Sequence, residues 1–215
     1  MRPVICLITD GRVAAGCGGG ALVEMVRAAA RAGVHLIQLR ERAVDDRELA
    51  ALAGECVSAV RGTRARIVVN DRLDVALAAR AHGVHLKGDS FPAQRARAIT
   101  PPGFLIGRSV HSVAEATRAS EGDAVDYLLF GTVFPSTSKP GLEPAGLAML
   151  ADAARAARVP LLAVGGITVD NAGMVARAGA DGLAAIGLFS GRQADSLAET
   201  VHRVTSAFDT LHTGS

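Results

Sequence analysis

Polar and charged side chains stand within or directly after several short hydrophobic runs of this 215-residue chain. In Ile37-Gln38-Leu39-Arg40 polar and apolar residues alternate, so the polar side chains share one face of an extended segment. Burying such groups costs free energy unless a partner or a ligand satisfies them, and the pattern therefore predicts a binding site. The side chains concerned are Gln38, Arg40, Arg42, Asn70, Asp71, Lys87, Asp89, Ser90, Arg108, Ser109 and His111.

A second group of candidate anion ligands follows a later hydrophobic run, in the stretch from Gly131 to Lys139. Its hydroxyl and ammonium groups are those of Ser136, Thr137, Ser138 and Lys139. Such groups donate hydrogen bonds to an oxyanion, and the guanidinium groups of Arg40 and Arg42 add bidentate contacts. A solvated flexible loop is the alternative interpretation of this stretch.

Glycines follow the last two hydrophobic runs, in Gly165-Gly166 and Ile186-Gly187. Without a side chain, backbone N–H groups approach an anion closely. In a closed eight-stranded barrel, phosphate commonly binds between the corresponding loops, at the N-terminus of a short helix. These residues are therefore predicted to bind a phosphate. Tight packing between strand and helix is the alternative reason for glycine at these positions.

Asp71 is a candidate Mg²⁺ ligand, because this ion takes one or two carboxylates together with phosphate oxygens. An acidic residue near a helix start, where it complements the helix dipole, is the alternative interpretation. His85 stands between apolar residues and is predicted to be packed inside the fold, whereas His111 is expected to bond the backbone. His202 and His212 are expected on the surface.

The hydrophobic pattern predicts eight strands that alternate with eight helices, with boundary errors of about two to four residues. The strands are expected at Val4–Thr9, Val34–Arg40, Arg66–Asn70, Gly83–Leu86, Leu105–Ser109, Tyr127–Phe130, Pro160–Val164 and Gly182–Ile186. The helices are expected at Gly20–Ala32, Asp45–Val60, Arg72–Ala79, Ala93–Ile99, Val113–Ser120, Gly146–Ala157, Val169–Ala178 and Ser196–Phe208. Polar residues follow the strands, whereas the opposite ends are expected to be mostly Gly, Ala, Val and Pro.

Strict alternation of strands and helices predicts an α/β fold with a parallel sheet, because parallel neighbours need crossover helices. Eight units in 215 residues favour a single (β/α)8 TIM barrel over residues 1–215, with 211–215 as a frayed tail. In such a barrel, the loops that follow the strands carry the site. A doubly wound open sheet is the alternative, but Gly18-Gly19-Gly20 lacks the glycine spacing of a dinucleotide site.

Composition argues against several classes of protein. Charged residues make up 20% of the chain, too few for disorder, and a net charge of +2 with interspersed signs gives no basic stripe for nucleic acid. No hydrophobic run approaches the roughly 20 residues of a membrane span. Cys6, Cys17 and Cys56 are odd in number and lack metal-ligand spacing, so they are predicted to be reduced thiols of a cytoplasmic protein. Assembly into a homo-oligomer stays open.

The chain resembles the thiamin phosphate synthase/TenI family, a family of barrels, over nearly its whole length. The matching segments are QLRER (38–42), VNDR (69–72), GVHL (83–86), IGRSVHS (106–112), DYLLFG (126–131), FPSTSK (134–139), AVGGI (163–167) and AGADG (178–182). So many matches in the same order are specific to the family.

The resemblance implies a synthase that joins hydroxymethylpyrimidine diphosphate to a thiazole phosphate. Diphosphate leaves first, and the thiazole nitrogen attacks the carbocation-like pyrimidine, while Mg²⁺ and cationic side chains stabilise the leaving group. The implied catalytic residues are Arg40, Ser109 and Lys139. The implied substrate-binding residues are Gln38, Asn70, Thr132, Ser136, Ser138, Gly166, Ile186 and Gly187. Asp71 is the implied magnesium ligand.

Within this set the resemblance divides the roles by substrate. The diphosphate would be held by Arg40, Asn70, Ser136, Ser138 and Lys139. Gln38 and Ser109 would face the pyrimidine. The backbone amides of Gly166, Ile186 and Gly187 would hold the thiazole phosphate, which agrees with the prediction made from the glycines alone.

The chain departs from each branch of the family at one position. Synthases usually carry two acidic residues after the fourth strand, but Ser90 stands at the second, so that either Asp89 replaces it or magnesium binds weakly. The TenI branch is a thiazole tautomerase, and its catalytic histidine is Thr132 here, whose hydroxyl is a poor general base at neutral pH. Three functions stay open: the synthase, which Asp71 and Lys139 favour, the tautomerase, and a non-catalytic regulatory protein that binds a thiazole or thiamin phosphate.

Overall fold

A computed structural model describes residues 3–13, 19–136, 141, 143–191 and 194–209, apart from the side chains of Ala194 and Asp195. In this part of the chain eight strands alternate with eight helices. The strands are β1 (Val4–Ile8), β2 (Leu36–Leu39), β3 (Arg66–Asn70), β4 (Gly83–Leu86), β5 (Leu105–Val110), β6 (Tyr127–Phe130), β7 (Leu161–Val164) and β8 (Gly182–Ala185). The helices are α1 (Gly20–Arg31), α2 (Asp46–Ala59), α3 (Leu73–Ala78), α4 (Ala93–Arg97), α5 (Val113–Ala119), α6 (Gly146–Ala156), α7 (Ala172–Arg177) and α8 (Ala194–Asp209).

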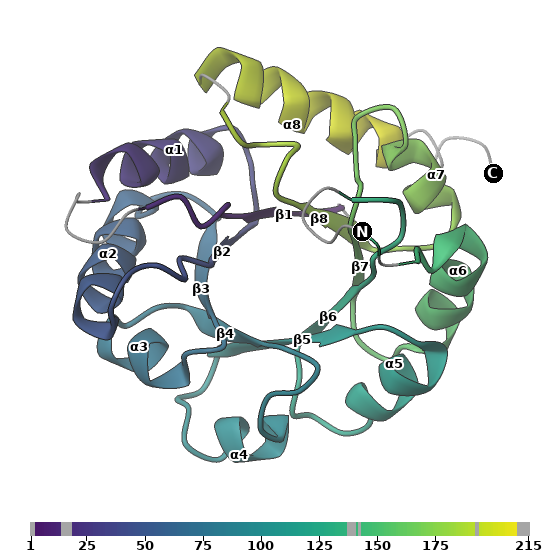
Figure 1. Cartoon of the computed structure of the whole chain (residues 1–215), viewed down its shortest axis with the longest axis horizontal. Helices are drawn as coiled ribbons and strands as arrows, with labels where there is room; N and C mark the ends of the chain where they lie inside the picture. Colours follow the sequence, from purple (N-terminus) through teal and green to yellow (C-terminus); the bar gives the residue numbers. More distant parts are fainter. Residues whose placement is uncertain (1–2, 14–18, 137–140, 142, 192–193, 210–215) are drawn as a thin grey trace.

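The eight strands form a closed barrel in sequence order, and all neighbours are parallel. β1 and β8 close the ring, with Val4 opposite Gly182 and Leu7 opposite Ala185. Figure 1 shows the strands as an inner ring with the helices around it. The predicted (β/α)8 TIM barrel is confirmed and the open doubly wound sheet is excluded. Because all strands run in the same direction, their C-terminal ends meet at one rim.

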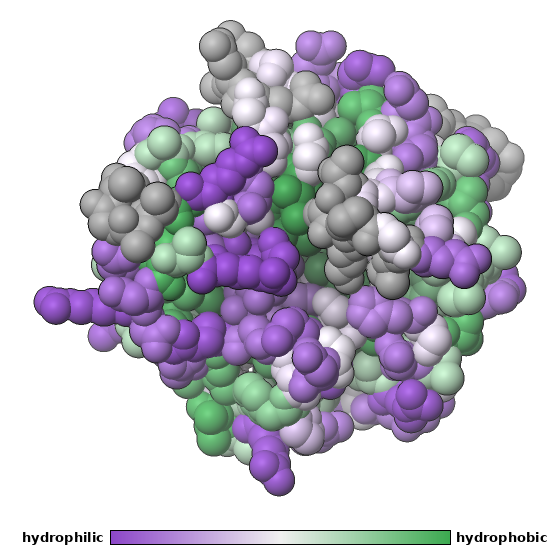
Figure 2. Space-filling view, in the orientation of Figure 1, coloured by the Kyte–Doolittle hydropathy of each residue, from purple (hydrophilic) through white to green (hydrophobic). Residues whose placement is uncertain are grey.

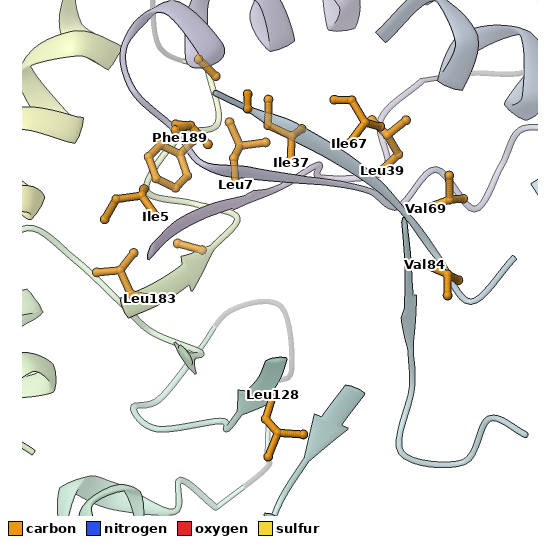
Figure 3. Close-up of a cluster of buried hydrophobic side chains, with 14 of the residues drawn as sticks. Ile5, Leu7, Ile37, Leu39, Ile67, Val69, Val84, Leu128, Leu183 and Phe189 are labelled. Atoms are coloured by element: carbon orange, nitrogen blue, oxygen red, sulfur yellow. The ribbon is translucent and has the colours of Figure 1, made fainter. Parts of the chain in front are cut away.

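Alternation along the strands divides the hydrophobic core into two parts. Side chains that point away from the ring pack beneath the helices in one large cluster, which includes Ile5, Leu7, Ile37 and Leu183 (Figure 3). A smaller cluster fills the ring itself with Cys6, Ile8, Leu36, Val68, Tyr127, Leu129, Leu162 and Ala184. The barrel interior is therefore a packed core and not a pore, as is usual for this fold.

At the N-terminal end of the barrel, four polar side chains each form a two-way pair with the preceding strand. The Asp126 carboxylate accepts the N–H of Ile106 at 2.6 Å, and the Asp126 N–H donates to the Ile106 carbonyl at 2.7 Å. Asp181 forms the same pair of hydrogen bonds with Leu161. Two histidines do so with Nδ1 as the acceptor: His82 pairs with Ile67, and His35 pairs with Ile5. The expectation that this end holds mostly Gly, Ala, Val and Pro is therefore wrong, because strand N–H groups there need side-chain acceptors.

Element boundaries differ from expectation for local reasons. α7 begins at Ala172 instead of Val169, because the Asn171 side chain accepts the N–H of Thr168 at 2.8 Å and holds a turn there. β2 begins at Leu36 instead of Val34, since the Val34 N–H still donates to a carbonyl of α1. The predicted frayed tail at 211–215 lies outside the described residues.

Two of the three cysteines fall within the described residues. Cys6 and Cys56 are buried free thiols, and burial raises the pKa of Cys56 to about 12. Both are therefore protonated and unreactive at neutral pH, in line with the predicted reduced thiols. Cys17 lies outside the described residues. No helix in the described part of the chain combines the length and the apolar character that crossing a membrane requires.

Candidate active site

A cavity of about 470 Å³ opens at the C-terminal rim of the barrel. The predicted site residues in its lining are Gln38, Arg40, Asn70, Asp89, Ser109, Thr132 and Ile186. Figure 2 shows hydrophilic residues gathered around the centre of the face in view. A larger cavity of about 650 Å³ lies at the other end, between α1 and α8, and none of the predicted site residues lines it. The rim cavity is therefore the candidate active site.

Gln38 and Asn70 line the cavity from neighbouring strands. Gln38 Nε2 donates to Asn70 Oδ1 at 2.8 Å. The Gln38 side chain is buried, and its Oε1 has no hydrogen-bond partner within the described residues. A buried acceptor without a partner costs about 1–3 kcal/mol, which a ligand N–H would recover. The pair thus offers a ligand the Gln38 acceptor and the amide donor of Asn70.

A buried chain of hydrogen bonds runs from the barrel core to Ser109. His85 Nδ1 lies 3.1 Å from the Tyr127 hydroxyl, and His85 Nε2 lies 2.9 Å from Ser109 Oγ. Burial lowers the pKa of His85 to about 3 and raises that of Tyr127, so both are neutral at pH 7. If Tyr127 donates to Nδ1, then Nε2–H donates to Ser109, and the donors of Tyr127 and His85 both have an acceptor. The Ser109 hydroxyl proton is then left for a ligand.

Gly107 makes the chain of hydrogen bonds sterically feasible. A Cβ at this position would come within 2.1 Å of Tyr127 Cζ, so only glycine leaves room for the ring inside the barrel. The Tyr127 ring lies 5.6 Å from that of His85, centroid to centroid. The small residue in β5 thereby positions the large residue in β6, and through it the Ser109 hydroxyl.

Arg40 and Arg42 bring positive charge to the β2 side of the cavity, which both of them line. Burial and, to a smaller extent, repulsion by Arg42 lower the pKa of Arg40, although a guanidinium stays charged at pH 7. The Thr9 hydroxyl accepts the Arg40 N–H at 2.8 Å, and buried Glu41 accepts the N–H of Val13 at 3.1 Å. These bonds tie the loop after β1 to the end of β2. Two adjacent guanidinium groups suit a polyanion.

The expected magnesium ligand, Asp71, lies at the rim with φ of 60°, in the left-handed region. Its Oδ2 lies 2.8 Å from Lys87 Nζ, and its Oδ1 accepts a hydrogen bond from the Ser90 hydroxyl. Asp89 is largely exposed and lies 3.6 Å from the same ammonium. Among the described residues, no three His, Cys, Asp or Glu side chains are grouped to hold a metal. The Lys87 ammonium thus lies beside both carboxylates that this part of the rim would offer to Mg²⁺.

The glycines after β7 and after β8 serve different purposes. Gly166 has φ of +63°, and a Cβ there would come within 2.4 Å of the Pro135 carbonyl oxygen, so packing against the loop after β6 requires glycine. At Gly187 a Cβ would meet no atom within 4 Å. Close packing, the alternative interpretation, thus explains Gly166 but not Gly187.

The backbone amides of both loops are available to an anion. No hydrogen bond among the described residues uses the N–H of Gly166 or Gly187. Residues 187–191 form turns, however, so the short helix that this fold often places beside the phosphate is not found in that stretch. In the described residues 187–191, an anion would therefore meet the backbone amides of turn residues and not those of a helix.

The remaining predicted residues fall around the cavity or outside the described chain. Asp71 contacts Lys87, which lines the cavity, and Gly166 and Gly187 each follow a lining residue. Ser136 is half-buried in the loop after β6. Ser138 and Lys139 lie outside the described residues.

The predictions for the histidines are confirmed where the structure describes them. His85 is buried, and His111 Nδ1 contacts the Gly131 carbonyl. His202 is exposed, and His212 lies outside the described residues.

Three side chains that shape the site have no specific role predicted from the sequence: Tyr127, Lys87 and Arg108. Lys87 stands two residues after His85 and so shares its inward face, which was the available signal. Nothing in the sequence marks Tyr127, because its hydroxyl reaches the site through a histidine 42 residues away. The Arg108 guanidinium donates to carbonyls of the loop after β4, and that pairing depends on the folded register.

Known proteins are similar to this chain in sequence. A family model described as "Thiamine monophosphate synthase" matches residues 5–189. A thiamine-phosphate synthase of Chlorobium luteolum is 39% identical over 213 residues, which cover 99% of this chain and 96% of that protein. A thiamine-phosphate synthase of Methanoculleus marisnigri is 44% identical over 164 residues, which cover 76% of this chain and 77% of that protein.

A solved structure agrees with these sequence matches. The thiamine phosphate pyrophosphorylase from Pyrococcus furiosus is 32% identical to this chain with a TM-score of 0.81, and the match covers 95% of this chain and 96% of that one. Barrel, rim cavity and sequence matches lead to one conclusion: the chain belongs to the TMP-TENI family of thiamine monophosphate synthases.

Proposed function

We propose that this protein couples hydroxymethylpyrimidine diphosphate to a thiazole phosphate, forming thiamin phosphate and releasing diphosphate. The observation that carries the proposal is the presence of two separate sets of anion donors around one cavity. Arg40 and Arg42 form one set, and the unpaired amides of Gly166 and Gly187 form the other. Two phosphate-bearing substrates need two such sets. The relatives named thiamine-phosphate synthase support the same activity.

In the proposed reaction the bond between the pyrimidine methylene carbon and the diphosphate oxygen breaks, and diphosphate leaves with the electron pair. The thiazole nitrogen then gives its lone pair to that carbon, and the new C–N bond completes the product. No proton moves in either step. The site therefore needs fixed positive charge near the leaving group more than it needs a general base.

The predicted site residues would meet these needs, including Ser138 and Lys139, which lie outside the described residues. Arg40 and the Asn70 amide would hold the leaving diphosphate, joined by Ser136, Ser138 and Lys139 from the loop after β6. The unpaired Oε1 of Gln38 would accept an N–H of the pyrimidine, and the Ser109 hydroxyl would donate to it. The apolar lining residues Ile8, Leu129 and Val164 suit the faces of a heteroaromatic ring.

The remaining substrate-binding residues would serve the thiazole. Amides of Gly166, Ile186 and Gly187 would bind its phosphate, and Thr132 lines the cavity beside them. This division places the two anions on different loops, with the reacting atoms between them. The apolar lining residues would limit the access of water to the carbocation once both substrates fill the cavity.

Magnesium use stays a prediction for this chain. When bound, Mg²⁺ would supply additional positive charge to the diphosphate. Asp71 and Asp89 are the carboxylates that the rim offers, and both lie beside Lys87. The cationic side chains carry the electrostatic role in the steps above.

The tautomerase and the regulatory protein are the less supported functions. A tautomerase has to move a proton, but Thr132 stands where its histidine is expected, and the pKa of about 3 makes His85 a poor base. A regulatory protein that binds a thiazole or thiamin phosphate binds one phosphate and would need only one anion set. Cytoplasmic location, one domain over residues 1–215 and the oligomeric state stay predictions.

The proposed function is tested by incubating purified protein with both substrates and Mg²⁺ and quantifying both products. Equal amounts of thiamin phosphate and diphosphate are expected, and neither without the thiazole phosphate. Thr132→Val tests the need for a base: thiamin phosphate should still form, because the synthase reaction needs no base, with a raised KM for the thiazole phosphate whose side of the cavity Thr132 lines. Absence of product from protein with a native circular dichroism spectrum rejects the proposal, and conversion of the thiazole precursor alone would favour the tautomerase.

A further inference from the structure

The loop after β4 is held in one conformation by bonds that its neighbours supply. The Ser90 N–H donates to the Lys87 carbonyl at 3.2 Å, and the Lys87 N–H donates to Ser90 Oγ at 2.8 Å, which closes a tight turn. The Arg108 guanidinium donates to the carbonyls of Gly88 at 2.8 Å, Phe91 at 3.2 Å and Ser90 at 3.3 Å. The turn is thus fixed to β5 from outside and closed from within.

This turn delivers two groups to the one carboxylate at the rim. Lys87 Nζ lies 2.8 Å from Asp71 Oδ2, and the Ser90 hydroxyl donates to Asp71 Oδ1. Asp89 Oδ1 lies 3.6 Å from the same ammonium. Both oxygens of Asp71 therefore have partners within the chain. A lysine side chain carries a positive charge at neutral pH, so the contact between Lys87 and Asp71 is an ion pair.

A cation between two carboxylates occupies the kind of place that a divalent ion would take. Mg²⁺ needs oxygen ligands that carry negative charge. Here Asp71 and Asp89 contribute two negative charges and Lys87 cancels one of them. The Ser90 hydroxyl donates to Asp71 at a position where a carboxylate would replace the negative charge that Lys87 cancels.

We propose that Lys87 is an internal competitor for the divalent cation: its ammonium holds Asp71 in the ligand-free protein, and a divalent ion binds Asp71 only by displacing it. The inference rests on the proposed function and concerns the metal requirement of the same site. It predicts that the ligand-free protein binds divalent ions weakly. It also predicts that the weakness comes from one positive charge and not from the shape of the loop.

The test is Mn²⁺ binding to the ligand-free protein, measured by electron paramagnetic resonance of free Mn²⁺. Lys87→Gln removes the charge from a half-exposed side chain and should fold normally. Its dissociation constant for Mn²⁺ is expected to fall about fivefold or more, as removal of a nearby like charge predicts. Adding Ser90→Asp to Lys87→Gln should tighten binding further, because a new carboxylate joins Asp71.

Two matched variants separate charge from other effects. Lys87→Arg keeps the charge and is expected to bind Mn²⁺ as weakly as the native protein. Arg95→Gln removes an exposed positive charge on α4, just beyond the turn, and should leave the affinity unchanged. Unchanged or weaker binding by Lys87→Gln overturns the proposal, and so does equal tightening by Lys87→Arg or Arg95→Gln.

Turnover is measured on the same preparations so that the two proposals can fail separately. Synthase activity with no change in Mn²⁺ affinity rejects the role of Lys87 and leaves the proposed function standing. Tighter Mn²⁺ binding by Lys87→Gln without turnover in any variant supports the competition and rejects the synthase.

Discussion

The two ends of the barrel handle polar side chains in opposite ways. At the N-terminal end, Asp126 and Asp181 each accept the N–H of the strand beside them and return their own N–H to its carbonyl. At the C-terminal end, Gln38 Oε1 and the amides of Gly166 and Gly187 have no partner within the described residues. The N-terminal pairs satisfy each other within the fold, whereas several polar groups at the C-terminal end are left for a ligand.

The difference indicates that residues at the N-terminal end of the barrel serve stability, whereas residues at the C-terminal end serve binding and catalysis. Parallel strands leave N–H groups without a partner where the ring begins, and a short side chain from the next strand supplies the acceptor. Where the ring ends, loops replace such partners, and the barrel presents donors and acceptors to the cavity. Substitutions at the first end should therefore lower stability, and substitutions at the second should lower activity.

The largest expected effect is at the C-terminal end, on replacing Arg40 by Met. Loss of a charged donor to the leaving diphosphate should lower kcat/KM by about 10²–10³-fold. Stability should change little, because burial and repulsion by Arg42 already make the charge of Arg40 unfavourable. Steady-state kinetics and urea unfolding check the two halves of this prediction. An Arg40→Met protein that keeps native activity would remove Arg40 from the site.

At the N-terminal end a substitution should lower stability and leave activity unchanged. Asp126→Ala leaves the Ile106 N–H without its acceptor. It also removes the ion pair between the Asp126 carboxylate and the Arg97 guanidinium, whose closest N and O atoms lie 2.6 Å apart. The free energy of unfolding should fall by about 1–3 kcal/mol, while kcat/KM of the folded protein stays native. Urea unfolding measures the first quantity. A loss of activity without a loss of stability would contradict the division between the two ends.

The two rim glycines provide a finer comparison within the C-terminal end. Gly166→Ala forces a side chain into a left-handed conformation and toward Pro135, so stability should fall by about 1–2 kcal/mol. Gly187→Ala meets open space and should leave stability unchanged. Both should raise KM for the thiazole phosphate without raising KM for the pyrimidine substrate. Equal stability of the two variants would show that packing does not explain Gly166.

The smallest expected effect is the response of stability to mild acid. Burial lowers the pKa of His82, whose Nδ1 accepts the Ile67 N–H, and lowers that of His85 to about 3. An unfolded histidine binds its proton near pH 6.5, so the contribution of these residues is complete above that pH and is lost as pH falls below it. Between pH 7.5 and 5.5 each should contribute a loss of at most about 1.4 kcal/mol.

Substituting one histidine shows how much of this pH dependence of stability comes from that residue. His82→Gln should reduce, but not abolish, the slope of unfolding free energy against pH, because His85 still titrates. Urea titrations at several pH values measure the slope. A variant with the slope of the native protein would show that His82 does not bind its proton differently on unfolding.

The fold and much of the rim could be predicted because both follow from alternation along the chain. Apolar runs separated by amphipathic stretches identified all eight strands, and the inward position of Gln38, Arg40, Asn70 and Ser109 followed from a period of two. Each of these predictions needs only residues that are close in sequence.

The remaining features could not be predicted because they join distant residues. The bond of Asp71 with Lys87 depends on a turn that Arg108 fixes from the next strand. The acceptor role of Asp126 appears only when its carboxylate meets a strand N–H 20 residues away. The residues next to a polar residue in the sequence do not show whether a distant strand N–H will be its partner. For this reason the N-terminal end was expected to be apolar.

The most direct test of the central claim is a crystal structure of the protein with diphosphate and thiazole phosphate bound. The account predicts two anions at the C-terminal rim, one against Arg40 and Asn70 and one against the amides of Gly166 and Gly187. Anions bound only in the cavity between α1 and α8, or a single anion site at the rim, would contradict it.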